Sequence, residues 1–130
     1  MMRRLAASLF AFVALALPAH AQDTTPVPPP APPPQLSLEQ RMILRCSAAF
    51  ALVANRQQSG ESWALDYPPL ATRGREFFVR GTAQLSDETG ADVSAFAPLL
   101  RAEAENLLDR PLLLQVMPVC LTLLPPEPTG

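Results

Sequence analysis

Two proline-rich segments enclose the only part of this sequence that can form a folded core. Seven of the nine residues from Pro26 to Pro34 are proline, and three more prolines follow residue 124. Proline lacks a backbone N–H and has a fixed φ, so these segments favour extended polyproline II structure over helix. We therefore predict a proline-rich disordered linker over residues 22–35, one domain over residues 36–124, and a proline-rich tail over residues 125–130.

The first 21 residues have the pattern of an export signal. Arg3 and Arg4 precede an apolar run of 13 residues from Leu5 to Leu17, and Ala19-His20-Ala21 supplies the small residues of a cleavage site. The run is shorter than the roughly 20 residues that a transmembrane helix needs. We predict cleavage after Ala21, a periplasmic location and no membrane span in the mature protein. The alternative is an uncleaved anchor, in which case the proline segment is a tether instead of a loose tail.

The segment that follows Leu36 shows the clearest helical pattern. Ser37 can cap a helix, and Gln40, three residues later, completes a capping box. Asn55 to Gly60 is expected to end this helix. Apolar residues recur on one face at intervals of four, four, three and four: Leu38, Met42, Cys46, Ala49 and Val53.

A second helix is predicted from Gly74 to Leu85, after an irregular stretch from Glu61 to Thr72 in which Pro68 and Pro69 force an extended break. Gly74 and Gly81 each disfavour helix by roughly 1 kcal/mol relative to alanine. Their spacing of seven places them on one face, where they could let a neighbouring helix approach closely.

Two more helices complete the predicted fold. One starts near Thr89, with Asp92 as its cap, and runs towards Asp109; Pro98 should kink it or split it. The other starts at Asp109, with Pro111 in its first turn. Its apolar face comprises Leu113, Val116 or Met117, Cys120 and Leu124. No alternating strand pattern competes, so we predict an all-α, small four-helix bundle-like domain.

The chain contains two cysteines, Cys46 and Cys120, each on the apolar face of its predicted helix. An even number of cysteines in an exported protein predicts a disulfide. The bond would tie the first helix to the last one, provided that these helices are neighbours. Two buried free thiols are the main alternative, and the absence of a Cys-x-x-Cys motif argues against a redox-active pair.

Composition excludes several classes of function. His20 is the only histidine and lies in the predicted signal, so the mature protein lacks the base or ligand of Ser-His, Cys-His and histidine–metal sites. We predict no catalytic residues, no metal and no cofactor. Removal of Arg3 and Arg4 leaves 8 basic residues against 12 acidic ones, which disfavours binding to nucleic acid. The absence of lysine, together with abundant alanine and proline, is typical of GC-rich bacterial genomes.

We predict a candidate binding surface around three aromatic and two basic positions. Trp63 and Tyr67 are the only tryptophan and tyrosine, and such residues often anchor partners at interfaces. Arg73 and Arg80 share a helix face, and either could bind an anion beside Phe77 or Phe78. The alternatives are structural: the aromatic pair covers one end of the core, Glu76 pairs with Arg80, and Phe77 and Phe78 pack inward.

These observations predict a non-enzymatic periplasmic binding or protein-interaction protein. Its partner would be a protein or a small apolar ligand, held in a groove of the helix bundle or on the surface around Trp63, Tyr67 and Phe77. The alternative is an acid- or stress-responsive periplasmic chaperone. Since the mature chain has carboxylates but no histidine, such a chaperone would open at roughly pH 3–4.

Overall fold

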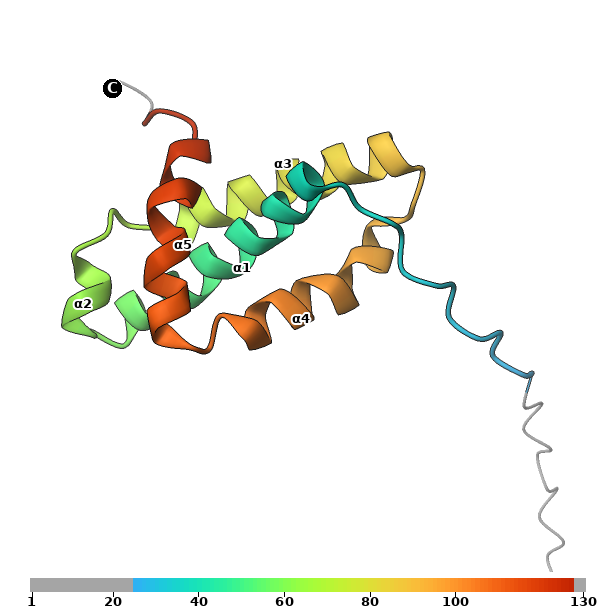
Figure 1. The fold of residues 1–130 in the computed structure, drawn as a ribbon, viewed down its shortest axis with the longest axis horizontal. Coiled ribbons are helices and arrows are strands. Elements are labelled where there is room, and N and C mark those ends of the chain that lie inside the picture. The colour runs from blue at the N-terminus through green and yellow to red at the C-terminus, as the bar shows by residue number, and fades with distance from the viewer. Residues whose placement is uncertain (1–24, 128–130) are drawn as a thin grey trace, which may run out of the picture.

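The computed structural model describes residues 25–127, and the predicted signal therefore lies outside the described residues. Within them the fold is all-α, as predicted, and no strand is present. The structure contains five α-helices and one 3-10 helix (Figure 1): α1 (Leu38–Gln58), α2 (Ser62–Leu65), α3 (Ala71–Thr89), η1 (Val93–Phe96), α4 (Ala97–Asn106) and α5 (Arg110–Leu123).

Helix α1 is the centre of the domain, because α3, α4 and α5 all pack against it. Its capping box forms as predicted: the Ser37 hydroxyl accepts from the Gln40 N–H, and the Ser37 N–H donates to Gln40 Oε1. The core surrounds α1 on several sides. Its largest fully buried side chains are Phe50, Phe96, Leu44, Leu70, Leu85, Leu107, Met117 and Val53.

The two glycines of α3 lie against α1. A Cβ at Gly74 would lie 2.9 Å from Phe50 Cβ, and a Cβ at Gly81 would overlap Ile43 Cγ2. Both glycines are buried, so the predicted close approach of a neighbouring helix is confirmed. Helix α3 extends beyond the predicted range of residues 74–85 at both ends and stops at Gly90, which has a left-handed φ of 70°.

A hydrogen-bond chain also joins the far end of α3 to the start of α1. Gln40 Nε2 donates to Glu88 Oε2 at 2.9 Å, and Gln84 Nε2 donates to Glu88 Oε1 at 2.7 Å. These two bonds favour the ionised carboxylate and hold the pKa of Glu88 below its ordinary value.

The predicted third helix is split in the structure. Asp92 caps η1 by accepting from the Ser94 N–H at 2.8 Å, and the hydroxyl and N–H of Ser94 hold the pKa of Asp92 below its ordinary value. Helix α4 then begins with Pro98 in its first turn. Proline is tolerated there because first-turn N–H groups have no intrahelical acceptor.

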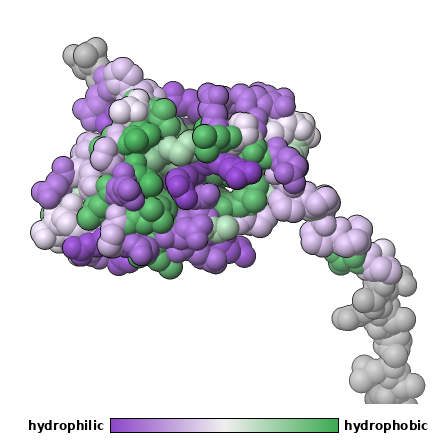
Figure 2. All heavy atoms as spheres, viewed as in Figure 1, coloured by the Kyte–Doolittle hydropathy of each residue, from purple (hydrophilic) through white to green (hydrophobic). Residues whose placement is uncertain are grey.

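Helix α5 begins where the sequence predicts. Asp109 accepts from the Leu112 N–H at 3.1 Å, and Pro111 lies in the first turn. The predicted apolar face is buried, with Met117 rather than Val116 as its fully buried member. Apolar surface still reaches the exterior in the region of α5 (Figure 2), where Val119 and Leu123 are exposed.

The predicted disulfide is present and ties α1 to α5. The sulfurs of Cys46 and Cys120 lie 2.10 Å apart, and their Cα atoms lie 5.2 Å apart. Both side chains are fully buried. The first and last helices are therefore neighbours, as the pairing required.

The ends of the described chain have different surroundings. Residues 25–37 belong to no helix or strand, and most of their side chains are exposed. Leu36, by contrast, packs on a small core cluster of Leu44, Leu85 and Phe96. At the other end, Arg73 donates to the Pro125 carbonyl at 2.7 Å. No helix within residues 25–127 is both long enough and apolar enough to cross a bilayer.

One amide side chain organises the connection between α1 and α3, which includes the short α2. Gln57 Nε2 donates to the carbonyls of Ala64, Tyr67 and Pro68 at 2.9–3.2 Å. Gln57 Oε1 accepts from the Leu70 N–H at 3.1 Å. Pro68 and Pro69 have no backbone N–H to donate. The Gln57 amide therefore supplies hydrogen-bond partners to backbone groups that a helix or strand would otherwise pair with one another.

Replacing Gln57 with methionine should lower the free energy of unfolding by about 2 kcal/mol, because partly buried backbone groups lose their partner while side-chain length is kept. Urea denaturation measures this loss. The neighbouring Gln58→Met is the matched control, since Gln58 makes no such bonds and is exposed. Equal losses in the two variants would contradict a role for the Gln57 amide.

Candidate functional site

The residues of the predicted binding surface are engaged in different ways. Trp63 is half-buried against the core, and its Nε1 donates to Glu61 Oε2 at 2.6 Å. The guanidinium of Arg110 lies 5.4 Å from the Trp63 ring centroid. Glu61 also pairs with Arg56 at 3.1 Å. These contacts join the end of α1 to α2 and the start of α5, and they agree with the interpretation that Trp63 covers one end of the core.

Tyr67 and Phe77 are also half-buried against the core, and Phe77 meets the edge of Phe50 with ring centroids 5.2 Å apart. Arg73 pairs with Glu127 at 3.3 Å. Arg80 is exposed, and residues 25–127 show no ion pair between it and Glu76. Binding of a partner at these five positions stays a prediction.

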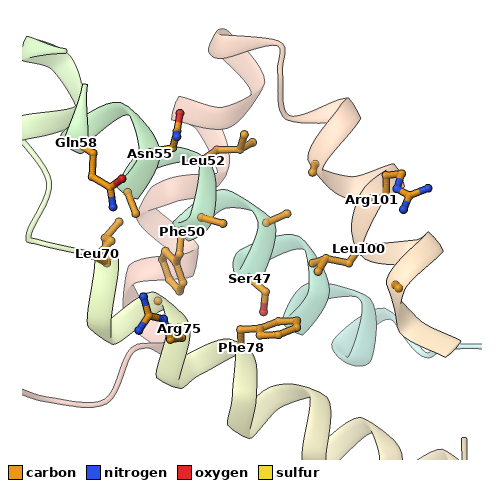
Figure 3. Close-up of a pocket in the computed structure, with 17 residues that line it drawn as sticks. Ser47, Phe50, Leu52, Asn55, Gln58, Leu70, Arg75, Phe78, Leu100 and Arg101 are labelled. Carbon is orange, nitrogen blue, oxygen red and sulfur yellow. The ribbon is translucent and has the colours of Figure 1, made fainter. Parts of the chain in front are cut away.

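A large cavity lies elsewhere in the described residues. It is a groove of about 730 Å³ between α3 and α4, and one face of α1 forms its floor (Figure 3). None of Trp63, Tyr67, Arg73, Phe77 or Arg80 lines it. We call it the α3/α4 groove.

Small side chains form the floor of the α3/α4 groove. Ala48, Ala51 and Asn55 recur at intervals of three and four along α1, which places them on one face. Ala51 and Asn55 are exposed. Cys46 and Val53, which belong to the core cluster shared with α5, lie on the opposite face of α1. Figure 3 accordingly shows α5 behind α1.

The walls are apolar at their base and basic above it. Phe78 of α3 and Leu100 of α4 are half-buried and line opposite walls. Arg75 and Arg101, one from each wall, are exposed. No aspartate or glutamate is among the lining residues, and neither arginine forms an ion pair within the part of the chain that the structure describes.

One feature of the sequence could have indicated this groove, namely the absence of charged residues along part of α1. Between Arg45 and Arg56, α1 carries no charged residue, and Ala48, Ala51 and Asn55 lie within this stretch. The solvent face of an amphipathic helix normally carries charge. An uncharged face of small residues is therefore the feature that could have indicated the floor.

Residues 25–127 contain no group of three His, Cys, Asp or Glu side chains that could hold a metal ion. The carboxyl group of Glu103 lies outside the groove and pairs with Arg45 at 2.9 Å. The α3/α4 groove therefore offers an apolar surface and positive charge to a binding partner.

The chain matches no family model, no curated protein and no solved structure in the comparisons made.

Proposed function

We propose that this protein is an exported, non-enzymatic binding protein that holds an apolar surface of a partner in the α3/α4 groove. The observation that carries the proposal is the groove itself, about 730 Å³ in volume and lined mainly by alanine, leucine and phenylalanine. Concave, largely apolar sites with a few placed polar groups are the usual form of a binding site.

The lining chemistry favours binding over turnover. Acid–base catalysis by carboxylates needs two such groups at one place, and no carboxylate lines the groove. The hydroxyl of Ser47 donates to the Ile43 carbonyl at 2.7 Å inside α1, which is a structural bond. Asn55 and Gln58 are the other uncharged polar side chains at the groove, and both can serve as hydrogen-bond partners.

Export to a bacterial periplasm is part of the same proposal. The pattern of residues 1–21 supports it, and the Cys46–Cys120 disulfide is typical of an oxidising compartment. A partner in the periplasm would be a protein or an apolar ligand.

Photo-crosslinking in the cells that produce the protein tests this function. A photoreactive residue at Ala51 should give a discrete crosslinked partner, whereas the same residue at Ala83, an exposed alanine of α3 outside the groove, should not. The partner is then identified and purified. Its affinity should fall at least about tenfold for Ala51→Arg, because the arginine fills the floor, and stay unchanged for Ala83→Arg. Equal binding to both variants would rule out the groove as the site.

The acid-responsive chaperone remains an alternative proposal. The hydrogen bonds that lower the pKa of Glu88 and Asp92 would delay protonation of these carboxyl groups as the pH falls. Opening of the helices at about pH 3–4, followed by near-ultraviolet circular dichroism, would be needed to support it.

A further inference from the structure

We propose that the occupant of the α3/α4 groove is an amphipathic helix of a partner protein that carries carboxylates beside its apolar face. This inference rests on the proposed function and specifies the chemistry of the partner. Three properties of the groove lead to it: its openness, its floor and its charge.

The α3/α4 groove is open to solvent along α1, and this favours a helix over a small molecule. Ala51, Asn55 and Gln58 of the floor are exposed, as are Ala71 and Ala97 of the walls. Sites for small ligands usually surround most of the ligand surface, which an open groove does not do. A helix needs only one face covered, because its backbone hydrogen bonds are internal.

The floor has the dimensions that helix packing needs. From Ser47 to Gln58 the floor follows α1 for twelve residues, or about 18 Å at 1.5 Å per residue. Small side chains at Ala48 and Ala51 allow a second helix to approach to the 8–10 Å axial separation of packed helices. Phe78 and Leu100 then flank it from the two walls. A helix seated there would contact α1 on the side opposite α5.

Charge selects among amphipathic helices. The charged side chains that line the groove are Arg75 and Arg101, on opposite walls, in a chain with 12 acidic and 10 basic residues. Both guanidinium groups are exposed and have no carboxylate partner within residues 25–127. Glutamate or aspartate on both flanks of an apolar helix face would meet one arginine on each side.

Three matched peptides of 18 residues test the inference. Each is a helix former with leucine at i, i+3, i+4 and i+7 positions, and the flanking positions carry glutamate, glutamine or lysine. Titration calorimetry with the full-length protein at low salt should give the highest affinity for the glutamate peptide, about tenfold above the lysine peptide, with glutamine between them. The double variant Arg75→Glu/Arg101→Glu should reverse this order. Ala51→Arg should remove binding of the glutamate peptide, and Ala83→Arg should not.

Each other result overturns the inference. If the glutamate and glutamine peptides bind with equal affinity, and both lose binding in Ala51→Arg, the groove is a binding site but its partner is not selected for acidic residues. If no peptide binds, the helix is excluded, while the crosslinking result at Ala51 still decides the proposed function. Saturable binding of dodecanoate alone would identify a small anionic amphiphile, and dimerisation lost in Ala51→Arg would identify a second copy of this chain.

Discussion

Replacing both Cys46 and Cys120 with alanine is expected to lower the free energy of unfolding by about 4 kcal/mol. The bond joins residues 74 positions apart in sequence, so its removal frees a long loop in the unfolded chain. Because stabilities of whole domains are only about 5–15 kcal/mol, the loss is a large part of the total for a core of this size. Urea denaturation of the oxidised protein and the double variant measures the difference.

Reduction of the wild-type protein is the matched control for the disulfide. Complete reduction by dithiothreitol should shift the urea midpoint in the same direction as the double variant, since both lose the cross-link and keep the same helices. A double variant as stable as the oxidised protein would mean that the bond contributes little beyond the packing between α1 and α5.

Replacing Gly74 with valine is expected to cost about 3 kcal/mol. The added Cβ would lie 2.9 Å from Phe50 Cβ, an atom next to the backbone of α1 that no rotamer change can move. The helices would have to separate, and the buried contacts of Phe50 would weaken. Alanine at position 74 would have two opposing effects. It removes the helix-propensity penalty of glycine, roughly 1 kcal/mol, but its Cβ still meets Phe50 Cβ.

Ala83→Val is the matched control for Gly74→Val, because it adds a β-branched side chain to an exposed position of the same helix. Its cost should be about 0.5 kcal/mol or less. Thermal unfolding followed by far-ultraviolet circular dichroism compares the two. Similar melting temperatures for both variants would show that the α1–α3 contact tolerates a wider spacing.

Local chemistry made several parts of the fold predictable from the sequence. Ser37 with Gln40, and Asp109 with Pro111, define helix starts within a few residues, because a cap and its acceptor or donor lie close together in the chain. The spacing of seven between Gly74 and Gly81 also indicated a close helix contact, because it places both glycines on one face of the helix. Cys46 and Cys120 each fell on a buried face, so their pairing followed once the helices were taken as neighbours.

The remaining features depend on residues far apart in sequence. Gln57 resembles any polar residue near a helix end, and its role appears only when α2 and the Pro68 region fold back on it. The α3/α4 groove likewise arises because α3 and α4 pack on different sides of α1. Arg75 and Arg101 are 26 positions apart and belong to different helices, so no local pattern relates them.

The central position of α1 has a consequence for the order of folding. Helix α1 precedes every helix that it packs against, and its buried residues contact segments as far along the chain as Cys120. An N-terminal fragment that stops before α5 leaves Cys46 without its disulfide partner and Val53 without part of its core cluster. The side of α1 that packs on α5 therefore stays uncovered until the chain has been made through α5.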